Sequence, residues 1–219
     1  MNSIAVVDYG RGNLRSVQKA FEKVNLRVTI TRSPQEILDA AALVLPGVGA
    51  FRDCMQTLDR LGLIRPLLHS LQAGKPYLGI CLGMQILFTE SDEFGPTPGL
   101  DIFPGRVCKF PESDGHGAAL KIPHMGWNTL LRQRNSPLFD GLPEDAYFYF
   151  VHSYYAEPAD SEVIVARTEY GTRFTSVIQR DHVFALQFHP EKSQRVGLEV
   201  LRNFGKVVQR CSNSSPPST

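Results

Sequence analysis

The sequence has little of what binding to nucleic acid or insertion into a membrane would require. Its 219 residues carry 23 basic and 22 acidic side chains, which gives a formal net charge of only +1. Nucleic-acid-binding proteins usually show a basic excess or a basic stripe. The longest apolar run, from Leu78 to Phe88, is interrupted by glycines and a glutamine and is too short to cross a bilayer. We therefore expect neither a nucleic-acid partner nor a membrane partner.

Cysteine is also scarce. The four cysteines, at positions 54, 81, 108 and 211, show no C-x-x-C spacing and no accompanying cluster of metal ligands. We therefore expect no disulfide framework, no metal site and no cofactor. The segment from Met1 to Val7 has no charged leader before its apolar part, which predicts a first strand rather than a signal peptide. A soluble protein of the reducing cytoplasm fits these features best.

Apolar strands alternate with helical patterns in the first half of the chain. We predict strands at residues 4–8, 26–30, 43–45 and 77–80, and helices at 13–24, 51–58 and 63–73, with one more helix opened by the N-cap Ser33 and Pro34. Buried strands separated by helices imply an α/β fold, in which a mostly parallel sheet has helices on both faces.

The second half of the chain has a different pattern. Residues 95–145 are rich in glycine and proline, and additional antiparallel strands joined by short connections are predicted at 106–110, 147–154, 163–168, 175–179 and 183–188. A helix is predicted from about 193 to 209. We expect a single domain over residues 1–211 and a disordered tail of Ser, Asn, Pro and Thr over residues 212–219.

Cys81 has the sequence setting of a nucleophile. It lies between Gly79 and Gly83, at the end of the strand predicted to reach Ile80, and residues 84–88 suit the start of a helix. This G-x-nucleophile-x-G spacing is typical of a sharp strand-to-helix turn, where neighbours without side chains leave room for a strained backbone. A nearby helix N-terminus would favour the thiolate. An isolated cysteine is more often a small buried hydrophobic residue, but the flanking glycines favour the nucleophile.

His189 is the best candidate among six histidines for the base that serves this sulfur. It stands at the C-terminal end of a predicted strand, where α/β sheets carry their sites. Pro190 fixes the chain after it, and Glu191 is close enough to return and hydrogen-bond the imidazole. A lone histidine before a proline is a weak signal, but its combination with the Cys81 turn predicts a Cys-His-Glu triad.

Attack on an amide carbonyl requires hydrogen-bond donors for the developing oxyanion. The amide of Leu82, directly after the nucleophile, is one candidate. The loop Pro46-Gly47-Val48-Gly49 follows another central strand, and its glycines would let the amide of Val48 or Gly49 face inward. Without Cys81, an ordinary strand-to-helix turn would explain this loop equally well.

Together the motifs Gly79-Ile80-Cys81-Leu82-Gly83-Met84-Gln85 and His189-Pro190-Glu191 resemble class I (triad) glutamine amidotransferases. Further segments resemble the glutaminase subunits of imidazole glycerol phosphate synthase, and they extend over residues 8–193. The most discriminating of these is Pro123-His124-Met125-Gly126-Trp127-Asn128, since the nucleophile and His-Pro-Glu motifs are shared with sister families. The other segments are residues 8–14, 46–51, 149–154 and 188–193.

This resemblance implies a flavodoxin-like fold and hydrolysis of glutamine to glutamate and ammonia through a γ-glutamyl thioester on Cys81. Ammonia would pass through a tunnel to a (β/α)₈-barrel cyclase subunit, in a heterodimer that makes imidazole glycerol phosphate and aminoimidazole carboxamide ribotide for histidine biosynthesis. By position, the resemblance implies glutamine-binding roles for Gly47, Gln85, Glu93, Ser153 and Tyr154, with residues 47–49 as a mobile oxyanion segment. It also implies that a second group faces the cyclase, namely Asn13, Trp127, Asn128 and Lys192.

Three alternatives remain open from the sequence. The chain could serve another amidotransferase that makes anthranilate, guanylate, carbamoyl phosphate or pyridoxal phosphate, although such a subunit should lack the segment 123–128. It could be a stand-alone cysteine hydrolase, such as a γ-glutamyl hydrolase, which is active without a partner. It could also be a non-catalytic binding module, which the intact Cys81, His189 and Glu191 disfavour.

Overall fold

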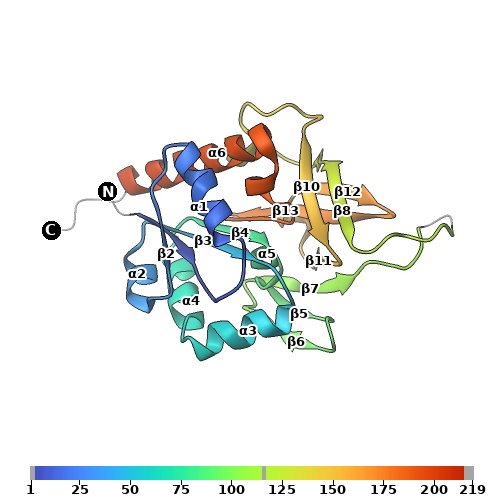
Figure 1. The fold of residues 1–219 in the computed structure, drawn as a ribbon, viewed down its shortest axis with the longest axis horizontal. Coiled ribbons are helices and arrows are strands. Elements are labelled where there is room, and N and C mark those ends of the chain that lie inside the picture. The colour runs from blue at the N-terminus through green and yellow to red at the C-terminus, as the bar shows by residue number, and fades with distance from the viewer. Residues whose placement is uncertain (1–2, 115–116, 215–219) are drawn as a thin grey trace.

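The centre of the computed structural model, which describes residues 3–114 and 117–214, is a set of parallel strands (Figure 1). Five neighbouring strands have the order β2-β1-β3-β4-β14, and each pairs in parallel with the next. This is the 2-1-3-4-5 order of flavodoxin-like sheets, as the resemblance implied. The strands are β1 (Ile4–Val7), β2 (Val28–Thr31), β3 (Ala42–Gly47), β4 (Tyr77–Cys81) and β14 (Val183–Leu186).

These strands are apolar throughout because helices cover both faces of the sheet. In β1, Ile4 and Val6 pack into the core beneath α1 and α6, whereas Ala5 and Val7 pack into the core beneath α2, α3 and α4. Figure 1 shows α1 and α6 on one side of the sheet and the other three helices on the opposite side. The helices are α1 (Leu14–Lys23), α2 (Pro34–Asp39), α3 (Phe51–Arg60), α4 (Ile64–Gln72) and α6 (Gln194–Ser214).

Antiparallel strands extend this sheet beyond β14, as the sequence predicted for the second half. The order continues β14-β13-β11-β7-β5-β6, in which β5 and β7 pair in parallel, and β12 joins β13 and β9. A separate two-stranded sheet is formed by β8 and β10. The strands are β5 (Phe88–Ser91), β6 (Thr97–Pro98), β7 (Phe103–Lys109), β8 (His124–Thr129), β9 (Leu131–Arg132), β10 (Tyr147–His152), β11 (Tyr154–Pro158), β12 (Ile164–Tyr170) and β13 (Thr172–Arg180). Three 3₁₀ turns cover Pro137–Phe139, Ser161–Val163 and Pro190–Lys192.

The predicted helix ends agree with the structure at α2 but not at α6. The Ser33 hydroxyl accepts a hydrogen bond from the Glu36 amide at 3.3 Å, so the predicted N-cap is confirmed. Helix α6 extends to Ser214. Residues 212–214 therefore belong to this helix and not to the predicted tail. The remaining tail residues, 215–219, lie outside the described part of the chain.

Two predicted elements near the site were wrong. The strand predicted over 147–154 is divided at Ser153 into β10 and β11, which pair in different sheets. The helix expected over 84–88 is instead a single turn, α5 (Leu82–Gln85), and Phe88 already begins β5. Every side chain from 82 to 88 is buried, so this segment has no apolar periodicity that could distinguish helix from strand.

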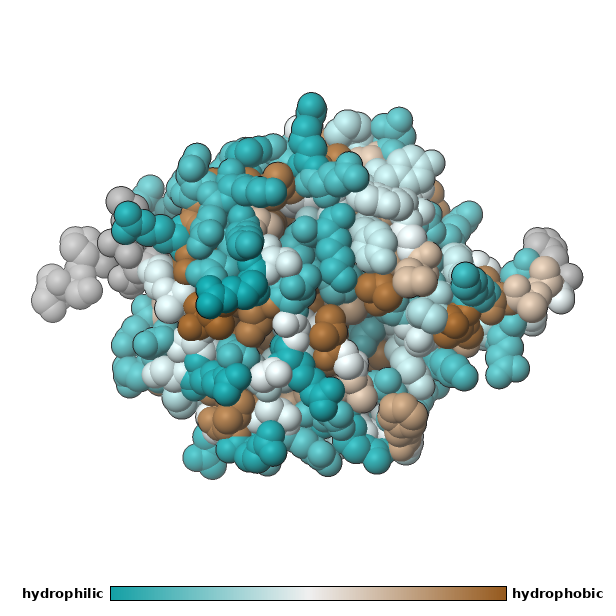
Figure 2. Space-filling model, viewed as in Figure 1, coloured by the Kyte–Doolittle hydropathy of each residue, from teal (hydrophilic) through white to brown (hydrophobic). Residues whose placement is uncertain are grey.

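Hydrophilic residues cover most of the face shown in Figure 2, with hydrophobic residues distributed among them. Within residues 3–114 and 117–214, no helix combines the length and hydropathy that a bilayer span requires. In the same ranges, no group of three or more His, Cys, Asp or Glu side chains is arranged to hold a metal ion.

Candidate active site

Cys81 occupies the sharp turn that the glycine spacing predicted. It is the last residue of β4, and α5 begins at Leu82. Its backbone has φ 55° and ψ −109°, a conformation that L-residues rarely adopt. Such strain persists only where the surrounding structure enforces it, and it is concentrated at functional sites.

The two flanking glycines are required by close backbone approaches. A Cβ atom on Gly79 would collide with the Gly83 carbonyl oxygen, and a Cβ atom on Gly83 would collide with the Leu45 carbonyl oxygen. Both contacts involve backbone atoms, which cannot rotate away as a flexible side chain could. The G-x-C-x-G pattern therefore has a steric cause in this fold.

The helix after Cys81 is shorter than the sequence predicted. Because α5 has only four residues, its dipole is smaller than that of a full helix. The contribution of a helix N-terminus to the thiolate is therefore smaller than the sequence predicted.

His189 and Glu191 form the predicted pair beside Cys81. Strand β14 lies parallel to β4, with Leu186 opposite Ile80, so His189 follows at the same edge of the sheet as Cys81. The Glu191 Oε1 atom lies 2.8 Å from His189 Nδ1, and both side chains are almost completely buried. The other ring nitrogen, Nε2, has no hydrogen-bond partner among the described residues. It is the atom left to exchange a proton with the sulfur or the substrate.

The surroundings of His189 favour its imidazolium form. Burial acts to lower its pKa, but the negative charge of a Cys81 thiolate and the hydrogen-bonded Glu191 carboxylate outweigh burial and raise the pKa to about 10. No described atom meets hydrogen-bond geometry at Nε2, so the influence of the sulfur on the ring is mainly coulombic. The site can therefore hold a proton on His189 that is ready for a leaving amine.

The predicted oxyanion loop lies against the nucleophile. Gly47 ends β3 directly opposite Cys81, and Val48 and Gly49 follow. The Val48 amide donates to the Tyr9 hydroxyl at 3.1 Å, and that hydroxyl lies 3.3 Å from the Val48 carbonyl oxygen. In this conformation the Val48 amide already donates its hydrogen bond to Tyr9. It could bind an oxyanion only after this hydrogen bond has broken.

A cavity of about 430 Å³ brings most of the predicted residues together. Eight of the predicted catalytic, oxyanion and substrate-binding residues line it, whereas Gly47, His189 and Glu191 are not among its lining residues. Lys192, predicted at the partner interface, also lines it, whereas Asn13, Trp127 and Asn128 do not. Its lining consists of Val48, Gly49, Cys81, Leu82, Gln85, Glu93, Pro123, Val151, His152, Ser153, Tyr154 and Lys192.

Two of the predicted substrate-binding side chains already have partners within the chain. Glu93 Oε2 accepts a hydrogen bond from the Phe51 amide at 2.6 Å, so this carboxylate caps the N-terminus of α3. Gln85 Nε2 donates to the Tyr154 carbonyl at 2.9 Å and to Gln187 Oε1 at 3.0 Å. Since both amide hydrogens of Gln85 are used, its Oε1 atom is the one available to a ligand.

Several residues around the site were not predicted from the sequence. Gln187 is fully buried and donates to Cys81 Sγ at 3.6 Å. His152 Nδ1 lies 2.8 Å from the Tyr154 carbonyl, and His152 Nε2 lies 3.0 Å from His124 Nδ1. Burial lowers the pKa of His152 to about 3 and that of His124 to about 4, so both rings are neutral. The alternation of strand residues could have found Gln187, since it stands two positions before His189.

Comparison with known proteins gives the family of the chain. The family model of class-I glutamine amidotransferases matches residues 5–208. The chain is 54% identical over 205 residues to imidazole glycerol phosphate synthase subunit HisH of Syntrophotalea carbinolica, covering 93% of this chain and 100% of that protein. It is 52% identical to the subunit HisH of Geobacter sulfurreducens, with 94% and 100% covered.

Solved structures share the fold at low sequence identity. A glutamine amidotransferase crystal structure superposes with a TM-score of 0.72 at 18% identity, covering 94% of this chain and 98% of that one. The structure of PurLQS from Thermotoga maritima gives a TM-score of 0.69 at 18% identity, with 96% and 99% covered. The chain therefore belongs to the class-I glutamine amidotransferases and, within them, to the HisH subunits of imidazole glycerol phosphate synthase.

Proposed function

We propose that the chain hydrolyses glutamine to glutamate and ammonia with Cys81, His189 and Glu191. The observation that carries this proposal is the shared sheet edge, where the strained Cys81 ends β4 and lines a cavity, and the buried His189–Glu191 pair follows the end of the neighbouring strand β14. The Cys81 sulfur attacks the side-chain amide carbon of glutamine and forms a γ-glutamyl thioester. His189 gives its proton to the leaving ammonia and then takes one from the water that hydrolyses the thioester.

The cavity offers groups that suit the rest of the substrate. Gln85 presents an acceptor oxygen, and the Glu93 carboxylate supplies negative charge that suits the α-ammonium group. Ser153 and Tyr154 also line the cavity. The Leu82 amide, with Gly47, Val48 and Gly49 beside it, is proposed to receive the oxyanion once the Val48–Tyr9 bond has opened.

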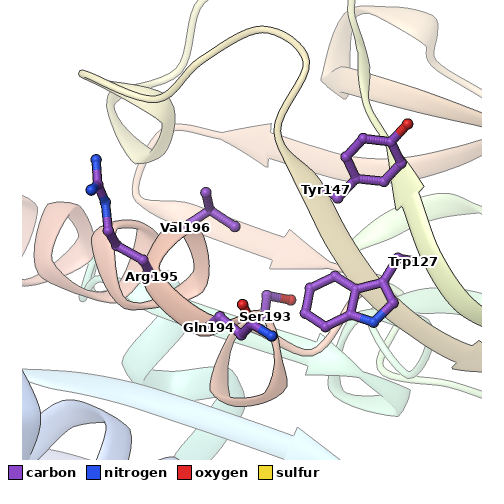
Figure 3. Close-up of a pocket in the computed structure, with 6 residues that line it drawn as sticks. All are labelled: Trp127, Tyr147, Ser193, Gln194, Arg195 and Val196. Atoms are coloured by element: carbon purple, nitrogen blue, oxygen red, sulfur yellow. The ribbon is translucent and has the colours of Figure 1, made fainter.

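We further propose that the face around Trp127 binds a cyclase subunit, in a heterodimer. Met125 and Trp127 on β8 and Tyr147 on β10 are 57%, 47% and 58% exposed, which is unusual for large apolar side chains. Trp127 and Tyr147 line a cavity of about 330 Å³ with the first residues of α6 (Figure 3). Figure 3 shows the Trp127 indole opposite Ser193 and Gln194. Aromatic anchors in such pockets are enriched at interfaces.

The other proposed interface residues lie between this face and the glutamine cavity or on α1. Lys192 lines the glutamine cavity, and its Nζ atom lies 5.6 Å above the Tyr149 ring, which in turn packs edge-on against Trp127. Asn13 is exposed at the start of α1. Asn128 uses its side-chain nitrogen to bind the Glu169 carbonyl, so its contribution to an interface would be smaller.

Ammonia released at Cys81 would thus enter the partner without meeting bulk water. The partner would use it to make imidazole glycerol phosphate and aminoimidazole carboxamide ribotide in histidine biosynthesis. The thiols of Cys54, Cys81 and Cys108 form no disulfide, which supports the proposal that the protein works in the reducing cytoplasm.

The test is ammonia release from glutamine by the full chain, alone and with the barrel cyclase and its bound ribotide ligand. We expect negligible release from the chain alone and strong stimulation by the liganded cyclase. High turnover without the partner would favour a stand-alone hydrolase. Stimulation by a different synthase, but not by the cyclase, would favour another amidotransferase. No release under any condition would favour a binding module.

A further inference from the structure

We propose that Gln187 is a positioning residue for the nucleophile, which holds the Cys81 thiolate through a side-chain hydrogen bond. The inference rests on the proposed role of Cys81. The amide nitrogen of Gln187 lies 3.6 Å from Cys81 Sγ, a normal distance for a hydrogen bond to sulfur, and Gln187 is fully buried. Gln187 is not among the described residues that line the cavity. It therefore acts through Cys81 and not directly on the substrate.

The orientation of the Gln187 amide follows from a backbone carbonyl. A carbonyl oxygen can only accept, so the Tyr154 carbonyl requires Gln85 to present its NH₂ group at 2.9 Å. The second hydrogen of that group then meets Gln187 Oε1 at 3.0 Å. This contact leaves the Gln187 NH₂ group to face the sulfur. Amide orientation is often ambiguous in proteins, but here the chain of partners permits one assignment.

A hydrogen-bond donor such as the Gln187 side-chain amide is important for the Cys81 thiolate at this position. The one-turn helix α5 provides little dipole, so fixed N–H groups near the sulfur gain in importance. A hydrogen bond to a charged group stabilises it more than a neutral hydrogen bond would, and burial strengthens this effect. Gln187 thus favours the anionic sulfur and limits its directions of movement, in addition to the charge on His189.

The same chain of hydrogen bonds links the nucleophile to the substrate wall. Tyr154 lines the cavity, and its carbonyl accepts from both Gln85 and His152. A shift of the segment at Tyr154 on substrate binding would move Gln85, and through it Gln187, relative to the sulfur. The network therefore connects occupancy of the glutamine cavity with the position of the thiolate.

The experiment measures the rate of Cys81 alkylation by iodoacetamide against pH in the full chain, together with kcat and KM for ammonia release in the stimulated complex. Gln187→Met removes the donor at similar length, and Gln187→Glu keeps the shape while placing a carboxylate oxygen at the sulfur. We expect the pH of half-maximal alkylation to rise by about 1 to 2 pH units and kcat to fall about 10- to 100-fold, with KM changed less than threefold.

The matched control is Ser176→Ala on β13. The Ser176 backbone carbonyl accepts from the Gln187 amide, and the Ser176 hydroxyl has no hydrogen-bond partner among the described residues. This variant should keep the native alkylation profile. An unchanged profile in both Gln187 variants, or the same shift in Ser176→Ala, would overturn the inference. Alkylation needs no glutamine turnover, so failure of the proposed function would appear separately, as absent ammonia release with the Gln187 effect on alkylation intact.

Discussion

The Tyr9 hydroxyl forms hydrogen bonds with both the backbone amide and the backbone carbonyl of Val48 in the predicted oxyanion loop. It accepts a hydrogen bond from the Val48 amide at 3.1 Å and lies 3.3 Å from the Val48 carbonyl oxygen, to which it donates. Tyr9 is itself buried, and burial raises the pKa of its phenol well above the usual range, so the hydroxyl stays protonated and can keep both roles. The loop is thereby held with the Val48 amide turned to Tyr9 and away from any oxyanion.

Tyr9→Phe should release this loop. Loss of the hydroxyl removes two neutral hydrogen bonds, so we expect unstimulated ammonia release to increase about 2- to 10-fold. The measurement is ammonia production by the chain without its partner. Tyr155→Phe, which removes a hydroxyl bonded to Glu157 away from the loop, is the control and should leave the rate unchanged. A rate that stays constant or falls in Tyr9→Phe would show that Tyr9 does not restrain the loop.

Glu191→Gln should impair catalysis without removing the nucleophile. The amide would keep the shape of the carboxylate but lose the charge that stabilises the imidazolium of His189, 2.8 Å away. We expect kcat for glutamine hydrolysis in the stimulated complex to fall about 10²- to 10⁴-fold. Near-native kcat in this variant would remove Glu191 from the triad.

The protonation of His189 should depend on Cys81. Folding raises the pKa of His189 from 6.5 to about 10. Protonation of this ring therefore increases the free energy of unfolding. This contribution to stability is complete below pH 6.5 and is lost as the pH rises towards 10. Cys81→Ala removes the largest charge that raises the pKa, so the pKa should fall.

Imidazole NMR titration of the native chain and the Cys81→Ala variant measures this change directly. The native ring should remain imidazolium at pH 8, and the variant should titrate at a lower pH. Identical titration curves would mean that sulfur and ring do not interact.

Gly83→Ala should destabilise the fold at the turn. The added Cβ atom would collide with the Leu45 carbonyl oxygen, which is fixed in β3. We expect the free energy of unfolding, measured in urea, to fall by about 1–3 kcal/mol or more. Gly62→Ala is the comparison, since that glycine has a positive φ of 67° but no heavy atom within 4 Å of the added Cβ atom. A smaller loss at Gly83 than at Gly62 would contradict the steric account.

Trp127→Ala should weaken binding to the cyclase. Trp127 is the single tryptophan of the chain and lines the surface cavity with Tyr147. Removal of such an aromatic anchor is expected to reduce the affinity about 10- to 100-fold, measurable by calorimetry. Phe94→Ala removes a more exposed aromatic ring, outside the β8–β10 sheet, and should have little effect. Equal losses in the two variants would argue against this face.

The candidate site residues that could be predicted from the sequence are those whose signals are local. The glycines around Cys81 and the spacing of His189 and Glu191 are short patterns with steric or geometric causes, and the structure places all three residues at one sheet edge. The contacts that Tyr9 and Gln187 make were missed because their partners lie far along the chain. Their bonds join residues separated by 39 and 106 positions, respectively.

The fold was predicted best where specific local signals mark the start of a helix or strand. Helix α2 and its N-cap were predictable because Ser33 and Pro34 are specific start signals. The break between β10 and β11 at Ser153 was not, because no glycine or proline marks it and the polar Ser153 is compatible with a continuous strand. The two strands are separated by their pairing partners, β8 for one and β7 and β13 for the other.

The most direct test of the account is to locate the covalent intermediate. The liganded complex is quenched with acid during glutamine turnover, digested and analysed by mass spectrometry. We expect a γ-glutamyl adduct on the peptide that contains Cys81 and none on the peptides of Cys54, Cys108 or Cys211. An adduct on another cysteine, or continued ammonia release by Cys81→Ala, would show that Cys81 is not the nucleophile.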